Sequence, residues 1–544
     1  MEIKAAEAYE YPLLIKSILL SPIGDNPARE IVYRGDVRHS YAAFKERVAR
    51  LAAALVKLGI GKGDTVAVMD WDSHRYLECY FAVPMIGAVL HTINIRLSPE
   101  QLIYTIDHAD DTIVFVNTDF LPLLEAIRAR LDKVKQYVLM TDSASSPGTT
   151  IRFAGEYEDL LSVAKPLQEF PDFDENTRAT TFYTTGTTGL PKGVFFSHRQ
   201  IVLHTIATLA TLAASSGGRN ISRDDVYMPL TPMFHVHAWG FPYVATMLGM
   251  KQIYPGKYVP ANLLALLASE KVTISHCVPT ILMMMLHDPS SASVDLSKWK
   301  VVIGGSALPK ALCLEAMSRG IDIQSGYGMS ETCPVIAISH MAPEDYSADA
   351  SSQAEHRTKS GYPIAFVQAR VVDPQGREQP WDDKSAGELV LRSPWLTQGY
   401  FKDKVNSDKL WAGGWLHTQD VAVRDATGAI RITDRLKDVI KVGGEWLSSL
   451  ELEDLFLVHP SVAEAAVIGR TDEKWGERPL AVIVLKPGKT ATADELHQHL
   501  MGFVDRGMLP RYAKETEVEF AQAIPKTSVG KIDKLSLRSS FPKA

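Results

Sequence analysis

A stretch rich in threonine and glycine, YTTGTTGLPKG, ends on Lys192 and Gly193. Glycine, threonine and proline supply almost no apolar area, so such a segment is ordered mainly by what it binds. Exposed backbone N–H groups, hydroxyls and one lysine form a concave anion site, and phosphate is the usual occupant. A Walker A loop is excluded because it ends on G-K-[ST], whereas here Lys192 follows Pro191. A plain hairpin is the alternative, although a two-residue turn would suffice for it. The stretch therefore predicts a phosphate loop of another class.

Three further polar clusters follow this loop. The segment DIQSGYGMSET carries Tyr327 between two glycines and a carboxylate at Glu331. In GGWLHTQDVA, Asp420 comes just after a tight turn, and a carboxylate at the end of a strand is well placed to accept hydrogen bonds from two ribose hydroxyls. The loop IPKTSVGKIDK holds Lys526 and Lys531. Each cluster alone also fits a structural role, since such residues commonly cap turns and helices or lie on the surface.

Composition limits the class of protein. The chain has 544 residues, of which 46% are hydrophobic, enough to bury large cores and too many for one compact domain. A formal net charge of −7 argues against sequence-independent binding to nucleic acid and against binding to an anionic membrane. The cysteines form no CxxC pair, which disfavours structural zinc and a disulfide framework. We expect all four to be small buried residues in a reducing compartment: Cys79, Cys277, Cys313 and Cys333.

No targeting or membrane-spanning segment is expected. The stretch MEIKAAEAYEYPLLIKSILL carries an early glutamate and interrupts its apolar run at Lys16, unlike a signal peptide. The runs IVLHTIATLATLAA and CVPTILMMML are too short to span a bilayer and predict buried helices. A soluble, cytoplasmic protein is therefore expected.

Helices and strands alternate along most of the chain. The segment SYAAFKERVARLAAALVKLGIGKGD has helical apolar spacing between a cap at Ser40 and a stop at Gly59, and TVAVMD follows as a buried strand. The segment SPEQLIYTIDHAD predicts a second helix, capped at Ser98, before the strand TIVFVN. Short strands are also expected at ATTFYT and GVFFSH, on either side of the threonine-rich loop. This rhythm predicts an α/β protein with largely parallel sheets between helices.

Composition changes after about residue 430. The connection IRITDRLKDVIKVGGEWLSSLELEDLF is charged and contains glycines, and it leads into short strands such as EAAVIG and LAVIVL. We place a domain boundary in DRLKD, which divides the chain into residues 1–436 and a smaller α+β domain at residues 437–544.

Seven motifs together resemble those of the adenylate-forming superfamily, which includes acyl-CoA synthetases, firefly luciferase and the adenylation domains of peptide synthetases. They occur in the family's order and spacing over nearly the whole chain: YTTGTTGLPKG, PMFHVHAWG, QSGYGMSET, GGWLHTQDVA, DRLKDVIKVGGEWLSSLELE, DEKWGERP and PKTSVGKIDK. The resemblance implies a large N-terminal domain of helix-sandwiched sheets with a small β subdomain, holding ATP and an acyl pocket. A small mobile α+β domain that carries a catalytic lysine would follow.

The resemblance assigns the residues around ATP. The threonine-rich segment resembles the loop that holds the β- and γ-phosphates and then releases pyrophosphate. Glu331 would bind Mg²⁺, while Asp420 and Arg435 would hold the ribose. The other expected nucleotide contacts are Thr184, Thr185, Gly186, Thr187, Thr188, Gly189 and Lys192 in the phosphate loop, Gly305, Ser306 and Ala307 beside the adenine and acyl chain, and Gly326, Tyr327, Gly328, Met329 and Ser330 in QSGYGMSET.

The resemblance also implies a two-step reaction with four catalytic residues: Thr185, His235, Glu331 and Lys531. A carboxylate and a triphosphate must approach one another, and Lys531 would offset their repulsion and the charge of the pentacovalent state. The thiol of CoA would then attack the acyl adenylate. Between the steps, the family's small domain rotates about the position of Lys437, which is otherwise a linker lysine. That rotation would withdraw Lys531 and bring up the VGGEW segment: Gly443, Gly444, Glu445 and Trp446.

The acyl pocket is expected to carry no cation for a second carboxylate. Its candidate lining residues are His235, Trp239, Gly240, Val278, Pro279, Thr280, Gly304, Gly328 and Met329. His235 matches the position that separates nucleotide from acyl pocket, and His237 is expected to be an ordinary pocket or core histidine. Trp239 would shorten the pocket, favouring short, medium or aromatic acids over long chains.

The segments FHVHAWG and KVGGEWLSS most resemble medium-chain fatty acyl-CoA synthetases, a group that includes ligases for small methylthio-alkanoates. The predicted function is therefore an acyl-CoA synthetase that uses ATP, Mg²⁺ and CoA, with a medium-chain fatty acid as substrate and a methylthio-alkanoic or aromatic acid as the alternative. The rival classes are an enzyme that passes the acyl group to a carrier protein or to oxygen, and a catalytically silent regulator. The presence of Lys531, Glu331 and Lys192 disfavours the silent protein. No nucleic acid partner or stable membrane insertion is expected, and monomer and homodimer both stay open.

One position departs from the family pattern. The residue before Asp420 is usually glycine, in HTGD, and here it is Gln419. The backbone turn is therefore expected to be less open than in relatives, without loss of ribose binding.

Overall fold

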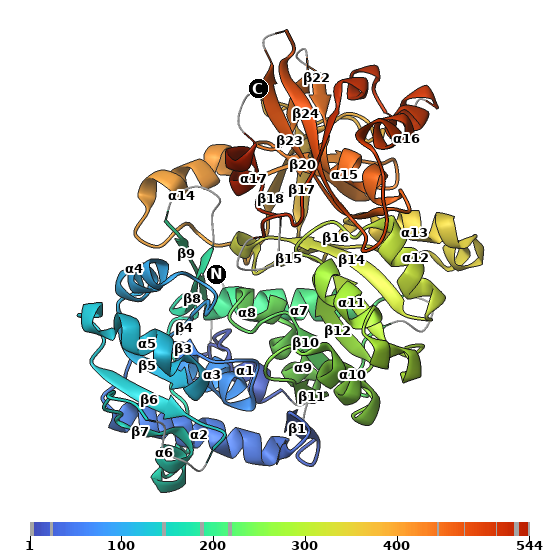
Figure 1. Cartoon of the computed structure of the whole chain (residues 1–544). Coiled ribbons are helices and arrows are strands. Elements are labelled where there is room, and N and C mark those ends of the chain that lie inside the picture. Colours follow the sequence, from blue (N-terminus) through green and yellow to red (C-terminus); the bar gives the residue numbers. More distant parts are fainter. Residues whose placement is uncertain are drawn as a thin grey trace.

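The computed structural model describes residues 5–21, 26–143, 148–184, 190–215, 220–442, 445–472, 474–506, 509–526 and 532–541. Within these residues the strands form four sheets, of seven, nine, four and five strands. The first two are largely parallel and packed with helices, the third is antiparallel, and the fourth belongs to a small C-terminal domain (Figure 1). The predicted α/β class, with a β subdomain and a small α+β C-terminal domain, is confirmed.

The seven-stranded sheet has the order β7-β6-β5-β3-β4-β8-β9. Its pairs are parallel except β8 with β9, which are antiparallel and carry the ends of the predicted phosphate loop. The strands are β3 (Thr65–Met69), β4 (Val89–Thr92), β5 (Asp111–Asn117), β6 (Gln136–Met140), β7 (Gly155–Glu156), β8 (Arg178–Thr184) and β9 (Lys192–Ser197). The helices between them in sequence are α3 (His74–Met85), α4 (Pro99–Ala109), α5 (Leu121–Ile127) and α6 (Tyr157–Val163), and α2 (Tyr41–Lys57) precedes β3.

The nine-stranded sheet has the order β16-β15-β14-β13-β12-β10-β11-β1-β2 and is parallel from β1 to β14. Its strands are β1 (Glu30–Tyr33), β2 (Val37–Ser40), β10 (Val226–Leu230), β11 (Lys251–Tyr254), β12 (Ile274–Cys277), β13 (Lys300–Ile303), β14 (Asp322–Gly328), β15 (Val335–Ile338) and β16 (Tyr362–Pro363). The helices of this part of the chain are α1 (Lys16–Leu19), α7 (His198–Ala213), α8 (Val236–Trp239), α9 (Phe241–Leu248), α10 (Pro260–Ser269), α11 (Pro279–Leu286), α12 (Lys310–Ser318) and α13 (Ala350–Thr358).

The two remaining sheets follow in the last third of the chain. The antiparallel subdomain consists of β17 (Gln368–Val372), β18 (Gly387–Arg392), β19 (Leu416–Arg424) and β20 (Ile430–Arg435), with α14 (Lys404–Leu410). The C-terminal sheet contains β21 (Ile440–Val442), β22 (Glu445–Leu447), β23 (Val462–Asp472), β24 (Gly476–Leu485) and β25 (Glu517–Phe520), with α15 (Ser449–Leu457), α16 (Ala493–Asp505) and α17 (Lys534–Ser540). The predicted boundary at residue 436 falls between β20 and β21, which belong to different sheets.

The local signals in the sequence explain several of these elements. The Ser40 side chain caps α2 by accepting from the Ala43 N–H, and Ser98 forms a capping box at the start of α4. Gly59 lies beyond α2 with a φ of 84°, a left-handed conformation that glycine adopts without strain. The run CVPTILMMML is only partly helical, because Cys277 ends β12 and α11 begins at Pro279.

Among the described residues, one hydrophobic core spans both large sheets and the subdomain, and a second belongs to the nine-stranded sheet and its helices. The C-terminal domain has cores of its own. All four cysteines are buried and free, as expected. Among the helices of the described residues, none combines the length and the apolar character needed to cross a membrane.

Candidate functional site

The carboxyl ends of neighbouring parallel strands gather most of the predicted pocket residues. Ligands in open α/β sheets bind at this edge, because the chain leaves the strands there in loops. Strand β10 leads to His235, β12 to Val278 and β13 to Gly304, and the adjacent β14 ends at Gly328. The structure therefore brings together residues that lie far apart in sequence.

Two glycines at this edge allow close approach of the backbones. A Cβ on Gly304 would lie 3.0 Å from the carbonyl oxygen of Gly326 and 3.0 Å from Cη2 of Trp239. On Gly328 it would lie 1.9 Å from the carbonyl oxygen of Pro334. A side chain at either position would displace its neighbours, so the indole of Trp239 reaches the end of β13 only because residue 304 is glycine.

The segment that carries Trp239 has an unusual backbone. Val236, His237, Ala238 and Trp239 have φ values of 48°, 56°, 47° and 57°, and Gly240 continues at 74°. Segment α8 is thus a left-handed turn, which costs roughly 1–2 kcal/mol for each residue that has a Cβ. All four are buried, and packing holds the turn in place. The turn presents the Trp239 ring 5.1 Å from that of His276.

The two histidines of FHVHAWG have different environments. His235 is half-buried at the mouth of the turn, whereas His237 is fully buried and packs edge-on against Phe182, with ring centres 5.2 Å apart. Burial lowers the pKa of His237 to about 3, so the ring is neutral near pH 7. Its two nitrogens have no hydrogen-bond partner among the described residues. This environment fits the expected core histidine.

The predicted ribose contacts come together on the subdomain. The Tyr327 hydroxyl donates to Oδ2 of Asp420 at 2.6 Å, and Nε of Arg435 lies 3.2 Å from Oδ1. Asp420 and Arg435 are direct partners in the register of β19 and β20. The expectation that Asp420 ends a strand is wrong, because β19 continues to Arg424. The glycine-containing turn lies before the strand, and Asp420 is near its centre.

Gln419 explains how a carboxylate inside a strand is turned toward Tyr327. Its φ is 59°, in the left-handed region where the family's usual glycine would be unstrained. Its N–H donates to Oε1 of Glu388 at 3.0 Å, and its carbonyl accepts from the Leu436 N–H at 2.9 Å. Gln419 therefore adopts the left-handed backbone conformation that suits the family's usual glycine, at the cost of backbone strain.

The predicted phosphate loop lies between two paired residues. Thr184, at the end of β8, is the register partner of Lys192, at the start of β9. Several predicted site residues lie outside the described part of the chain: Thr185, Gly186, Thr187, Thr188, Gly189, Gly443, Gly444 and Lys531. Glu445 and Trp446 lie in strand β22.

The predicted metal ligand lies in a short 3-10 turn, Ser330–Thr332, directly after β14. Glu331 is 7% exposed, and burial raises the pKa of its carboxyl, while Tyr400, Arg435 and Lys192 act in the opposite direction. The Tyr400 hydroxyl donates to Oε1 of Glu331 at 2.7 Å. Sequence analysis missed Tyr400, whose only signal is the turn glycine before it in TQGYF.

The remaining predicted residues are more exposed to solvent than Glu331. Ser306 and Ala307 are exposed after β13, Met329 and Thr280 are half-buried, and Lys437 is exposed after β20. Beside Lys437 the subdomain meets the C-terminal domain, where the Ser449 N–H donates to Oδ2 of Asp434 at 2.6 Å. The exposed position of Lys437 after β20 does not by itself assign it a catalytic contact.

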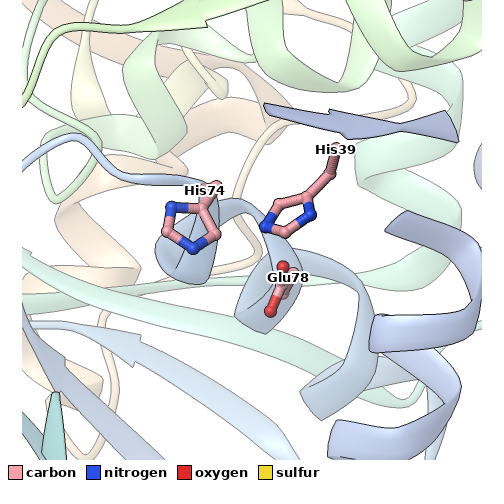
Figure 2. A group of neighbouring side chains, drawn as sticks. All are labelled: His39, His74 and Glu78. Atoms are coloured by element: carbon pink, nitrogen blue, oxygen red, sulfur yellow. The ribbon is translucent and has the colours of Figure 1, made fainter. Parts of the chain in front are cut away.

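A separate cluster has the composition of a metal site (Figure 2). His39 on β2 and His74 and Glu78 on α3 place their ligand atoms within 4.8 Å of one another. However, Nε of Arg47 donates to Oε1 of Glu78 at 2.6 Å, and the Tyr157 hydroxyl donates to Oε2 at 2.6 Å. A guanidinium already neutralises the carboxylate and would repel a second cation. The cluster is therefore a buried ion-pair network.

Comparison with known families identifies the class of protein. Residues 23–401 match the family described as "AMP-binding enzyme". Residues 451–531 match the family described as "AMP-binding enzyme C-terminal domain". The chain belongs to the AMP-binding enzyme family, and it is an AMP-forming acid–CoA ligase. The superfamily indicated by the seven motifs is thereby confirmed.

Three curated relatives match over nearly their whole length. A long-chain-fatty-acid–CoA ligase of Thermus thermophilus is 40% identical, over 94% of this chain and 93% of the relative. A 3-methylmercaptopropionyl-CoA ligase of Ruegeria pomeroyi is 36% identical over 97% and 98%, and a medium-chain-fatty-acid–CoA ligase of Ectopseudomonas oleovorans is 36% identical over 97% and 96%. The fold also resembles the crystal structure of the anthranilate CoA ligase AuaEII, with a TM-score of 0.84 at 24% identity, covering 99% of each chain.

Proposed function

We propose that this ligase activates a medium-chain fatty acid. The observation that carries the proposal is the indole of Trp239, which packs against Gly304 at the end of β13 and limits the depth available to an acyl chain. The proposed lining residues Val278, Thr280 and Met329 are uncharged, which suits an unsubstituted alkyl tail. A small methylthio-alkanoic acid is the second candidate, because it fits the same short pocket and a relative bears that activity in its name.

The adenylation step uses groups from both large sheets and the subdomain. Asp420 already accepts a hydrogen bond from Tyr327 and forms an ion pair with Arg435, and a carboxylate has about four lone-pair sites, so two ribose hydroxyls can still donate to it. The loop between Thr184 and Lys192 would bind the triphosphate through its backbone N–H groups. The substrate carboxylate is the nucleophile, and no side-chain nucleophile is needed.

Glu331 is the proposed Mg²⁺ ligand. The buried Glu331 carboxylate accepts from the neutral Tyr400 hydroxyl, so it keeps acceptor sites for a hard cation that accompanies phosphate oxygens. The ion would offset negative charge at the α-phosphorus. We expect Glu331→Gln to weaken metal-dependent acyl-AMP formation, with partial recovery at raised Mg²⁺. The check is the Mg²⁺ dependence of pyrophosphate release, and an unchanged dependence contradicts the assignment.

The second step would take place after rotation of the C-terminal domain about Lys437. In this proposal Lys531 stabilises the adenylation transition state and then leaves, and the segment with Glu445 and Trp446 approaches the thiol of CoA. Free CoA as acceptor is supported by relatives named as CoA ligases over nearly the whole chain.

One assay tests these assignments together. Purified enzyme is given ATP, Mg²⁺ and a panel of linear, methylthio, aromatic and amino-substituted acids, with CoA or a phosphopantetheinylated carrier protein as acceptor. We expect CoA-dependent AMP release to be greatest for uncharged acids of medium length. Turnover with the carrier protein alone would establish the other acceptor, and turnover of long chains in preference would contradict the short pocket.

The proposed compartment is the cytoplasm, supported by four buried free cysteines that suit a reducing environment. Fractionation of the source cells, followed by an activity assay of each fraction, tests this placement.

A further inference from the structure

A short segment between the subdomain strands β18 and β19 contacts residues of the proposed phosphate site. Residues 397–401 run beside β9, the strand that follows the phosphate loop. The Phe401 N–H donates to the carbonyl of Gly193 at 2.8 Å, and Tyr400 forms an antiparallel bridge with Val194. The segment is thus joined by its backbone to the residues directly after Lys192.

The same segment is also joined to the proposed metal ligand. The Thr397 N–H donates to the carbonyl of Glu331 at 2.9 Å, and the Tyr400 hydroxyl donates to the Glu331 carboxylate at 2.7 Å. On the other side, Nζ of Lys192 lies 4.7 Å from the centre of the Tyr400 ring. One side chain therefore contacts both proposed phosphate-site groups, which come from different sheets.

We propose that Tyr400 is a positioning residue for adenylation, whose hydroxyl orients the Glu331 carboxylate toward the metal and whose ring holds the Lys192 ammonium beside the phosphates. This inference rests on the proposed magnesium role of Glu331.

The chemistry of the two contacts supports different tasks for the hydroxyl and the ring. The hydroxyl takes one lone pair of Oε1, so the carboxylate keeps acceptor sites for a cation while its orientation is fixed. Partners of this kind typically change metal affinity by about 10- to 100-fold when removed. The ring face attracts an ammonium without neutralising it, so Lys192 stays charged for phosphate.

The test measures binding of a nucleotide instead of turnover. The probe is an ATP analogue that cannot be cleaved between its α- and β-phosphates, titrated calorimetrically with and without saturating Mg²⁺. The ratio of the two dissociation constants, without metal over with metal, gives the enhancement of binding by Mg²⁺. It is measured for wild type, Tyr400→Phe, Tyr400→Leu, Glu331→Gln and the double variant Tyr400→Phe with Glu331→Gln.

We expect Tyr400→Phe to lower the enhancement about 10-fold and to leave binding without metal unchanged, because the ring is kept. In the Glu331→Gln background, Tyr400→Phe should lower the enhancement by Mg²⁺ no further. Tyr400→Leu should in addition weaken binding without metal by about two- to fivefold, through loss of the ring. Tyr362→Phe is the matched control, since it removes a hydroxyl that contacts Thr427 at 2.9 Å on the subdomain. Thermal unfolding of each variant without ligand reports on its folding.

The outcomes distinguish the role of Tyr400 from the proposed Mg²⁺ role of Glu331, on which it rests. If wild type binds the analogue equally well with and without Mg²⁺, the magnesium role of Glu331 is overturned, and this inference with it. If wild type shows the enhancement and Tyr400→Phe keeps it within twofold or increases it, only the role of Tyr400 is overturned. An equal loss in the Glu331→Gln background would show that the hydroxyl acts elsewhere and would also overturn it.

Discussion

The indole of Trp239 is the proposed limit on how far an acyl chain can reach. Its atoms would lie 3.0 Å from a Cβ at position 304, so there is no unused space between the ring and β13. We expect Trp239→Ala to shift preference toward longer acids, by up to ~0.8 kcal/mol, or about fourfold in kcat/KM, for each methylene that enters the opened space. The measurement is kcat/KM across linear acids of increasing length.

The control for this change is Trp381→Ala, because Trp381 is 43% exposed and lies on the subdomain. It should leave the chain-length profile as in wild type. An unchanged profile in Trp239→Ala itself would mean that the indole serves core packing and leaves the pocket depth to other residues.

The backbone strain at Gln419 predicts a stabilising substitution. A left-handed residue with a Cβ costs roughly 1–2 kcal/mol, and glycine avoids this cost while losing about 0.5–1 kcal/mol more chain entropy on folding. Gln419→Gly should therefore raise the free energy of unfolding by up to about 1.5 kcal/mol, measured by urea denaturation. The same change at Gln398, for which the structure records no positive φ, should not stabilise the protein. A loss of stability in Gln419→Gly would show that the glutamine side chain outweighs the strain.

Single residues also show where sequence reasoning reaches its limit. Asp420 and Arg435 were predicted to hold the ribose and Tyr327 to lie at the adenine, and the structure places the three side chains in contact around Asp420. Tyr400 was not predicted, because its contacts with Glu331 and Lys192 depend on how two sheets meet, which no local pattern encodes. The left-handed turn at Val236 was equally invisible, since a β-branched residue gives no signal for positive φ.

At the scale of elements, the proposed hinge lies in the connection between β20 and β21, and substitutions there and at Lys531 would test the two half-reactions separately. Lys531→Ala should slow acyl-AMP formation by about 10²–10³-fold, as is typical for loss of one such electrostatic group, and should spare thioester formation from supplied acyl-AMP. Lys437→Pro fixes φ near −65° at the proposed hinge and should trap one orientation. If that orientation is the adenylating one, acyl-AMP forms while transfer to CoA stalls.

Both steps are followed directly, as pyrophosphate release from acid and ATP and as thioester formation from synthetic acyl-AMP and CoA. Lys526→Ala is the matched lysine control, because Lys526 pairs with Glu464 at 2.9 Å within the C-terminal domain. Equal loss of both steps in Lys531→Ala, or loss of neither in Lys437→Pro, would contradict domain alternation.

Elements with strong local signals were predicted well. Helices α2 and α4 begin at the predicted caps, and strands β8 and β9 flank the threonine-rich loop as expected. The extent of β19 was misjudged, because the glycines of GGWLH were taken as the turn next to Asp420, whereas the strand starts at Leu416 and runs past it. A bulge inside a strand leaves the alternation of polar and apolar residues too irregular to recognise.

For the molecule as a whole, a buried ion network joins the subdomain to the C-terminal domain. Nζ of Lys534 lies 2.7 Å from Oε1 of Glu453 and donates to the Ser449 hydroxyl at 2.6 Å, and that hydroxyl in turn donates to Oδ1 of Asp434 at 3.0 Å. The Lys534 side chain is 10% exposed. Lys534→Met would leave two buried carboxylates without their cation, which typically costs about 3–5 kcal/mol.

We expect this loss in denaturant unfolding of the full chain, seen as a lower midpoint or as an earlier, separate transition of the C-terminal domain. Lys404→Met is the control, because Lys404 pairs with Asp408 at 2.7 Å with its side chain 84% exposed, and exposed pairs contribute little. An effect of Lys534→Met no larger than that of the control would mean that water or other groups compensate the network.

The domain plan followed from composition and motif order, whereas the order of strands within the sheets did not. Strand β1 pairs with β11 more than 200 residues later, with Ile31 opposite Gln252, and no signal in either segment specifies that partner. The boundary at residue 436 stays a prediction, supported by the change of sheet between β20 and β21.

The pairing of Thr184 with Lys192 would allow the segment between them, the proposed phosphate loop, to be exchanged as a unit. Because both ends are anchored by one register pair, a loop of equal length from a relative can be grafted between them without shifting β8 against β9, whereas a slip of one residue would turn every following side chain to the other face. Chimeras built at these two positions would transfer traits of triphosphate handling, such as the rate of pyrophosphate departure or tolerance of other nucleotides. Selectivity for the acid would stay with the recipient, because Trp239 and Gly304 follow strands β10 and β13 of the other sheet.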